Sequence, residues 1–261
     1  MLPCGYPSIP LYQELVESDR FAEMSRFAGA FIEANADALA YYAQRWVKNP
    51  IHNWSRRWEY MYVYERIAAF AEARPGEALT LLDAGSGLTF FPHYVASRHP
   101  GVSIACGDSD ARLYEDAQRL GPPASDRVRY SVQDIERLGY EDGAFNLIYC
   151  LSVLEHCRYP GESLKHLYRT LKPGGRLILT IDVSLDGQVE IPVRLAARLI
   201  QMLVHRFKPD GRYDEQIGQF QPAEHVSTEW ARRIDVSLLP WAPPRFHLLS
   251  FFCMSFTRPE T

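Results

Sequence analysis

The chain has 261 residues, of which 47% are hydrophobic, and its formal net charge at pH 7 is -4. This is enough apolar material for one domain with additions, and the negative balance argues against a nucleic-acid partner held mainly by phosphate contacts. No apolar run approaches the roughly 18 residues that span a bilayer, and the N-terminus lacks the basic-then-apolar layout of a signal peptide. We therefore expect a cytoplasmic protein with no membrane segment.

The N-terminal part of the chain is predicted to be helical. Apolar residues recur at helical spacing over residues 11–48, where Asn49-Pro50 stops the pattern. A segment dense in Trp, Tyr and Arg follows and leads into a second helix that runs to about Arg74. We expect residues 1–76 to form a helical cap or lid.

From residue 79 the pattern changes to alternating strands and helices. Strands are predicted at 79–83, 102–106, 128–132, 145–150 and 176–181, with helices at 91–98, 110–119 and 161–171. A hairpin-like turn is expected at Lys172-Pro-Gly-Gly175. This alternation predicts an α/β fold with a doubly wound, mostly parallel sheet and right-handed crossovers.

The last third of the chain has a looser pattern. An amphipathic helix is predicted at 191–207, a helix capped by Ser227 at 228–234, and a terminal strand at 247–256. We expect residues 77–261 to form the core, with a helical insertion at about 184–245.

The most informative stretch is Leu81-Leu-Asp-Ala-Gly-Ser-Gly-Leu88, where an apolar strand runs into a glycine turn. Such a turn opens a crevice at the carboxyl edge of a parallel sheet, where open α/β folds bind ligands. Gly85 and Gly87 let the backbone approach a ligand that a Cβ would push away. The alternative is a strand-to-loop turn with no ligand.

Two further acidic residues follow the next two strands. Asp108 stands at the distance from the glycine turn at which a carboxylate reaches both hydroxyls of a ribose, although a solvated turn Asp is an equal alternative. Asp134 and Ile135 suit the amino group and ring of an adenine, although Asp134 also suits a helix N-cap. Phe90 stands where a dinucleotide fingerprint has its third glycine, which speaks against a bound pyrophosphate.

Together these motifs resemble the class I S-adenosylmethionine-dependent methyltransferases of the small-molecule type. The resemblance covers about residues 79–181, in family order and spacing, and it is carried by Leu81-Leu-Asp-Ala-Gly-Ser-Gly87, Ala105-Cys-Gly-Asp-Ser109, Gln133-Asp-Ile135, Phe145-Asn-Leu-Ile-Tyr-Cys-Leu-Ser-Val-Leu-Glu-His156 and Leu171-Lys-Pro-Gly-Gly-Arg176. It implies a Rossmann-like sheet of the seven-stranded type and S-adenosylmethionine as cofactor.

The resemblance also implies a role for each matching residue. The methionine half of the cofactor would lie on Asp83, Gly85 and Gly87, the ribose on Asp108, the adenine on Asp134 and Ile135, and the sulfonium beside Leu151. Ser86 and Ser109 are further candidates for cofactor contacts. The sequence departs from the family at Asn146, where an Asp is frequent, so a role for charge there is in doubt.

The aromatic segment 53–64 has two interpretations that remain open. It forms either a lid over the cofactor or a scaffold helix packed on the sheet. As a lid, it would offer Arg56 or Arg57 to the cofactor carboxylate. Arg57 and Tyr62 are the candidate cofactor-binding residues of this segment.

His156, at the carboxyl edge after the fourth strand, is a weak candidate for a catalytic base because the pKa of histidine lies near neutral. The alternative is a histidine packed at the start of a helix. The five cysteines are scattered without a C-x-x-C pair, and no metal site is expected.

The predicted function is methyl transfer to an oxygen, nitrogen or carbon nucleophile of a small organic acceptor, in specialised metabolism. The acceptor pocket is expected from the N-terminal helices and residues 183–245, whose aromatic residues either line it or only pack: Tyr213, Phe220, Trp230 and Trp241. The alternatives are an RNA or protein methyltransferase and a catalytically silent cofactor-binding relative. The acceptor and the oligomeric state are not predicted.

Overall fold

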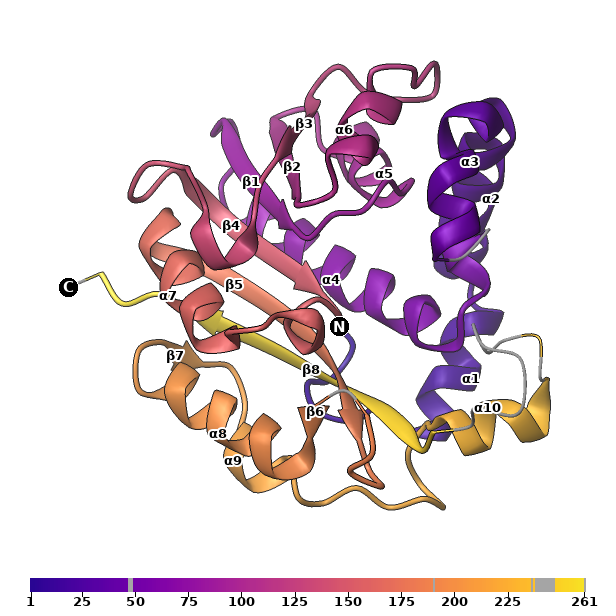
Figure 1. Ribbon diagram of the computed structural model, residues 1–261, viewed down its shortest axis with the longest axis vertical. Helices are drawn as coiled ribbons and strands as arrows, with labels where there is room; N and C mark the ends of the chain where they lie inside the picture. Colours follow the sequence, from indigo (N-terminus) through magenta and orange to yellow (C-terminus); the bar gives the residue numbers. More distant parts are fainter. Residues whose placement is uncertain (47–48, 190, 236, 238–246, 261) are drawn as a thin grey trace.

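The computed structural model describes residues 1–46, 49–189, 191–235, 237 and 247–260. Its centre is a sheet whose strands run in the order β3-β2-β1-β4-β5-β8-β7, with β6 paired to β5 off this path (Figure 1). The strands are β1 Leu79–Ala84, β2 Val102–Asp108, β3 Val128–Val132, β4 Phe145–Leu151, β5 Leu171–Ser184, β6 Ile191–Pro192, β7 Lys208–Pro209 and β8 Leu249–Thr257. The predicted doubly wound α/β sheet is confirmed.

The first five strands are parallel to one another, and the C-terminal strand β8 runs in the opposite direction. Strand β1 pairs in parallel with β2 and β4, and β8 runs antiparallel along β5 from Arg176↔Thr257 to Ser184↔Leu249. Because β1, β2, β3 and β4 share one direction, their carboxyl ends meet at one edge of the sheet. The residues that follow these strands therefore come together there.

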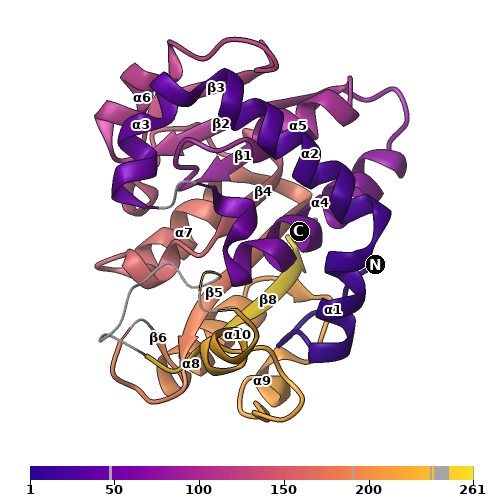
Figure 2. The same cartoon turned by 90° about the vertical axis from the view of Figure 1, so that its right-hand side faces the viewer.

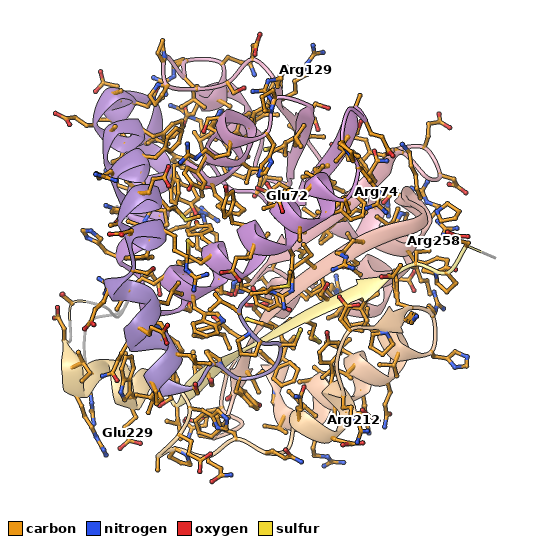
Figure 3. All side chains as sticks on the ribbon, turned by 180° about the vertical axis from the view of Figure 1, so that it is seen from behind. Glu72, Arg74, Arg129, Arg212, Glu229 and Arg258 are labelled. Carbon is orange, nitrogen blue, oxygen red and sulfur yellow. The ribbon has the colours of Figure 1, made fainter. Side chains whose placement is uncertain are left out.

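Helices cover both faces of the sheet (Figures 1 and 2). They are α1 Ile9–Glu17, α2 Asp19–Ala34, α3 Ala36–Arg45, α4 Trp54–Glu72, α5 Phe91–Arg98, α6 Ala111–Ala117, α7 Pro160–Thr170, α8 Val193–Val204, α9 Tyr213–Gln216 and α10 Thr228–Ile234, with short 3-10 turns η1 Pro50–His52, η2 Ile135–Arg137 and η3 Leu154–His156. One apolar cluster joins α1, α2, α4 and α5 to the sheet, and a second joins α7, α8 and α9. Exposed charged side chains such as Arg129 and Arg212 lie at the outer edge of the molecule (Figure 3).

The long N-terminal helix expected over residues 11–48 is three helices. Ser18 ends α1 in an extended conformation, and its hydroxyl oxygen accepts a hydrogen bond from the Phe21 N–H at the start of α2. Asn35 interrupts the helical conformation again, between α2 and α3. Periodicity alone cannot detect such breaks, because the apolar stripe continues through both of them.

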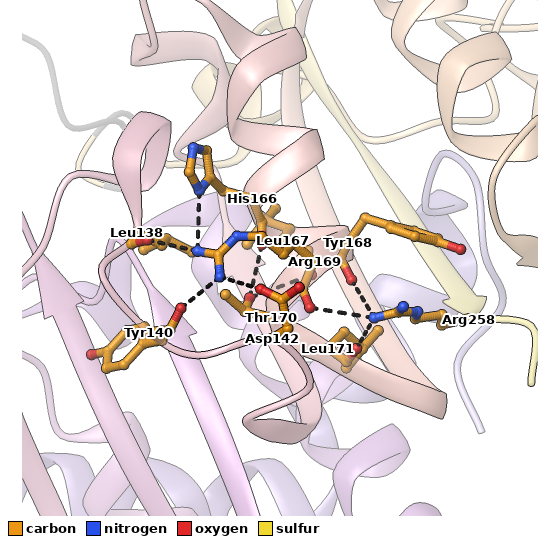
Figure 4. A network of polar contacts seen from close by, with 10 residues as sticks. All are labelled: Leu138, Tyr140, Asp142, His166, Leu167, Tyr168, Arg169, Thr170, Leu171 and Arg258. Carbon is orange, nitrogen blue, oxygen red and sulfur yellow. Dashed lines mark hydrogen bonds and ion pairs between the residues drawn. The ribbon is translucent and has the colours of Figure 1, made fainter.

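The fifth strand is longer than predicted, and the hairpin-like turn at its start belongs to it. The pairing of β4 with β5 shifts register between Phe145↔Leu171 and Leu147↔Arg176, so residues 172–175 form an irregularity within β5. Helix α7 ends just before this point, where Arg258 donates to the main-chain oxygens of Tyr168 and Arg169 at 2.9 and 3.3 Å (Figure 4). A cation at these orphan carbonyls is a favourable helix end.

The aromatic segment after residue 53 forms the scaffold helix α4 rather than a free lid. The Asn53 side chain caps it by accepting from the Ser55 N–H at 3.1 Å. Trp54, Trp58 and Tyr62 are almost wholly buried between the N-terminal helices and the sheet. The predicted helical insertion contains α8, α9 and α10, and its last part, residues 238–246, lies outside the described residues. Within the described ranges, no helix combines the length and apolarity needed to cross a membrane.

Candidate functional site

A cavity of about 440 Å³ lies at the carboxyl edge of the sheet. Ten of the residues predicted for the site line it: Asp83, Gly85, Ser86, Gly87, Asp108, Ser109, Asp134, Ile135, Leu151 and His156. The other lining residues are Tyr42, Trp46, Arg56, Tyr60, Thr89, Gln133, Glu136, Ser152, Val153, Cys157 and Arg158. The fold thus gathers residues from four strand ends and two N-terminal helices.

The turn after β1 requires glycine at two positions. Gly85 has φ +76°, and a Cβ built there would lie 2.5 Å from the Val153 side chain. Gly87 has φ +56°, and its Cβ would lie 2.6 Å from the Tyr42 ring. Both the backbone conformation and the surrounding space therefore exclude a larger residue, and the turn presents bare backbone to the cavity.

Asp108 is held by the main chain on both of its oxygens. Its Oδ2 accepts from the Gly87 N–H at 2.9 Å and its Oδ1 from the Asp110 N–H at 3.0 Å. The carboxylate therefore fixes the glycine turn. Each oxygen keeps a second lone pair for a hydroxyl donor in the cavity.

Asp134 combines the two roles between which the sequence did not decide. Its Oδ1 accepts from the Glu136 N–H at 2.9 Å, which makes it the N-cap of η2. The residue also lines the cavity beside Ile135, whose side chain is buried. A cap uses one carboxylate oxygen, so the second remains available to a donor in the cavity.

Asp83 is the most electrostatically perturbed carboxyl of the lining. Only 3% of the residue is exposed, and this burial is the main reason why its pKa rises to about 8. The nearby negative charge of Asp108 adds to the rise, and Arg56 opposes it. Such a carboxyl ionises readily only when a cation is placed beside it.

The structure corrects two of the predicted cofactor contacts. Arg57 and Tyr62 do not line the cavity: Arg57 lies beside Tyr12, and the Tyr62 hydroxyl lies 3.1 Å from the sulfur of Cys4. Their places are taken by Arg56 and Tyr60, which lie one helical turn apart on the other side of α4.

Tyr42 on helix α3 and Trp46, which follows the end of that helix, were not predicted as site residues. They complete the wall that faces the glycine turn. Apart from their aromatic character, nothing in the local sequence marks them, since they reach the cavity only through the packing of α3 against α6.

The aromatic residues expected for an acceptor pocket in the C-terminal insertion do not reach the cavity. Tyr213 is buried and donates to the Ser255 main-chain oxygen at 2.8 Å. Phe220 packs against Tyr6, and Trp230 packs against Tyr12. Trp241 lies outside the described residues. The described aromatic residues of the insertion therefore pack against strand β8 and the N-terminal segment, and the described walls of the cavity come from α3, α4 and the strand ends.

His156 ends the short turn η3 at the rim of the cavity. Its ring centroid lies 5.9 Å from that of Trp46, which is 52% exposed. No group of three His, Cys, Asp or Glu in the described part of the chain is arranged to hold a metal ion.

Asn146, the departure from the family pattern, has a structural role. Its Oδ1 accepts from the Thr80 N–H at 3.0 Å and from Lys172 Nζ at 3.2 Å. It thereby ties the starts of β1, β4 and β5 together, far from the carboxyl edge. An amide oxygen is sufficient for this purpose, so no charge is needed there.

Comparison with known proteins agrees with this geometry. Residues 82–179 match the family described as Methyltransferase domain. The chain carries a class I methyltransferase domain. The matched residues of this domain include the glycine turn and the ends of the four strands that border the cavity. Domains of this class use S-adenosylmethionine as their cofactor.

Two curated methyltransferases illustrate the range of relatives. The chain is 29% identical over 190 residues to ubiquinone biosynthesis O-methyltransferase of Xanthomonas oryzae pv. oryzae, covering 69% of this chain and 75% of that protein. It is 28% identical over 116 residues to phosphoethanolamine N-methyltransferase 2 of Caenorhabditis elegans, covering 44% of this chain. That match spans only 26% of the nematode protein, about a quarter of its length.

Solved structures share the fold. The chain is similar to the cyclase SpnF with a TM-score of 0.54 at 21% identity, over 75% of this chain and 80% of that one. It is also similar to a putative sarcosine dimethylglycine methyltransferase from Galdieria sulphuraria, with a TM-score of 0.51 at 16% identity, over 77% and 86% of the two chains. At these identities the likeness concerns the fold alone.

Proposed function

We propose that this protein binds S-adenosylmethionine in the cavity and transfers its methyl group to a small organic acceptor. The observation that carries the proposal is that three successive strand ends present Asp83 to Gly87, Asp108 and Asp134 to one cavity. A nucleoside with an amino-acid tail needs these three contacts, in this order, along the sheet edge.

Each part of the cofactor has a chemically suited partner in the lining. The bare backbone of Gly85 and Gly87 suits the amino-acid part, and the guanidinium of Arg56 suits its carboxylate. The remaining lone pairs of Asp108 suit the ribose hydroxyls, and Asp134 with Ile135 suits the adenine. Leu151 is the candidate neighbour of the sulfonium.

Bound S-adenosylmethionine supplies an already activated methyl group. The task of the protein is then to align an acceptor with that group and to keep water away. The half-buried Tyr42 and the buried Tyr60 wall the cavity on the side of the N-terminal helices. Trp46 offers a half-exposed aromatic face at the rim, which suits a small organic acceptor. The two curated relatives are named for a ubiquinone-pathway and a phosphoethanolamine substrate, both small molecules.

The first test is calorimetry with S-adenosylhomocysteine. We expect the wild type to bind it and Asp108→Ala to lose at least about tenfold in affinity, because the ribose hydroxyls lose charge-assisted hydrogen bonds. Asp126→Ala, at an exposed loop carboxylate that does not line the cavity, is the matched control. Absence of binding to the wild type would refute the proposal.

The acceptor class is tested with S-adenosylmethionine labelled in its methyl group. We expect transfer to members of a panel of small hydroxyl, amine and activated-carbon compounds. Transfer to transfer RNA or protein instead would overturn the small-molecule assignment. Tight binding with transfer to none of these would indicate the catalytically silent alternative.

His156 is proposed as the base for a hydroxyl acceptor. With such an acceptor, His156→Gln should lower kcat by at least about 100-fold while leaving the affinity for S-adenosylhomocysteine unchanged. His52→Gln, at an exposed histidine of η1, is the control. A loss below about tenfold would mean that His156 is not the base.

A further inference from the structure

Directly beside the cavity, helix α4 buries a carboxylate that the proposed reaction does not use. None of the Glu59 residue is exposed, and it is not a lining residue of the cavity. Burying a carboxylate is costly unless it is paired and hydrogen-bonded. The partners that offset the cost of burying Glu59 therefore indicate the role of its side chain.

Glu59 has three side-chain partners, which come from three different elements. Its Oε1 accepts from the Ser152 hydroxyl at 2.6 Å and from the Thr180 hydroxyl on β5. Its Oε2 pairs with the Arg56 guanidinium at 2.5 Å, one turn earlier on α4. Two of these partners, Arg56 and Ser152, line the cavity.

Ser152 holds an unusual backbone conformation that Glu59 supports. Its φ is +48°, and among the described residues it is the non-glycine residue with positive φ. Such a conformation is strained for a residue with a side chain and persists only where neighbours enforce it. The Ser152 N–H donates to the Thr180 main-chain oxygen at 3.0 Å, and its hydroxyl donates to Glu59. These bonds fix the loop that carries Leu151 and Val153 into the cavity.

Glu59 also holds the Arg56 guanidinium in place, through their ion pair. Burial disfavours its charge, but Glu59, with Tyr60 and Asp182 nearby, outweighs this effect and raises the pKa of the guanidinium. Arginine has a long and flexible stem, so an anchored guanidinium loses less entropy when it binds a ligand than a free one does.

We infer that Glu59 is a positioning residue of the cofactor site, which orients the Arg56 guanidinium toward the carboxylate of the cofactor and fixes the loop after β4. The inference rests on the proposed function. Glu59 acts through Arg56 and Ser152 and itself contacts no ligand. Removing its charge should therefore affect mainly the amino-acid end of the cofactor.

Two ligands separate this role from a merely structural one. S-adenosylhomocysteine carries the carboxylate, whereas methylthioadenosine has the same nucleoside and sulfur without the amino-acid part. We expect Glu59→Gln to raise the Kd of S-adenosylhomocysteine about tenfold or more and that of methylthioadenosine less than threefold. Glu65→Gln, the same substitution on the same helix at a residue paired with Arg20, should change neither.

A second variant keeps the test independent of how well Glu59→Gln folds. Thr180 does not line the cavity, and Thr180→Val removes one donor from Glu59, together with one acceptor of the Ser152 N–H, with little change in shape. It should raise the Kd of S-adenosylhomocysteine a few-fold, again more than that of methylthioadenosine. Equal losses for both ligands, or no loss in either variant, would overturn the inference. If the wild type binds neither ligand, the proposed function itself fails, which is a separate result.

Discussion

At the scale of single residues, Asp83 is the carboxyl of the cavity lining whose pKa the fold shifts upward. Its pKa is raised to about 8, chiefly by burial, so the carboxyl is largely protonated at neutral pH in the free protein. A ligand ammonium or sulfonium beside it favours the ionised form. Cofactor binding at pH 7 should therefore release a proton from Asp83.

This proton release gives a pH-dependent affinity with a definite sign. Below about pH 8 the affinity for S-adenosylhomocysteine should rise with pH, because less of Asp83 then has to be deprotonated for binding. Calorimetry in two buffers of different ionisation enthalpy measures the released proton directly. In Asp83→Asn, both the proton release and the rise in affinity should disappear. An unchanged rise in that variant would assign the effect to another group.

The site residues that the sequence could predict are those that follow parallel strands. Asp108 and Asp134 line one cavity, as predicted, because the ends of successive parallel strands meet at one edge, whatever the details of packing. Arg57 and Tyr62 do not line it, because their positions depend on which side of α4 faces the cavity. Arg56 and Tyr60 are four residues apart and therefore lie on the same side of α4. The helix has apolar residues on most sides, however, so the sequence does not show which side faces the cavity.

At the scale of elements, helix α3 is attached directly to the strand end that carries Asp108. The Tyr41 hydroxyl donates to Asp110 Oδ2 at 2.8 Å, and the Asp110 N–H in turn donates to Asp108. Figure 2 shows α3 beside α6, over the part of the sheet that contains β3. The wall formed by Tyr42 and Trp46 is therefore coupled to the proposed ribose site.

Removing this attachment should loosen α3 without changing the cavity lining. Tyr41→Phe loses one hydrogen bond, worth about 1 kcal/mol, so S-adenosylhomocysteine should dissociate roughly fivefold faster. Amide hydrogen exchange in residues 36–46 should also become faster. Tyr114→Phe, at an exposed tyrosine on α6, is the control. An unchanged dissociation rate in Tyr41→Phe would show that α3 does not restrain the ligand.

Element boundaries were the least predictable part of the fold. The continuous apolar stripe hid the breaks at Ser18 and Asn35, and Lys172-Pro-Gly-Gly175 looked like a turn although it lies within β5. The break at Ser18 is a local cap, whereas strand pairing decides the outcome at residues 172–175. The pairing of β5 with β4 includes Phe145↔Leu171, on the far side of the local turn signal.

At the scale of the whole molecule, the two ends of the chain are joined through the sheet. Gly5 exchanges two main-chain hydrogen bonds with Cys253 in β8, and the Val226 N–H donates to the Pro7 oxygen at 3.0 Å. The N-terminal residues Tyr12 and Leu15 belong to the apolar cluster that also contains β1 and β8 residues. The helical cap predicted for residues 1–76 therefore shares its core with the sheet, and we expect both to unfold together.

This shared core makes thermal unfolding a test of both fold and function. Tryptophan fluorescence reports on the α4 side through Trp54 and Trp58, and far-UV circular dichroism reports on the whole chain. The two transitions should coincide. A ligand at 100 times its Kd stabilises the native state by about 2.7 kcal/mol, which for a chain of this size raises Tm by roughly 5–10 °C. S-adenosylhomocysteine should shift both transitions equally, because a cavity lined from α3, α4 and four strand ends is lost only when the cap and the sheet separate. If only the fluorescence transition moved, the cap would be an independent unit.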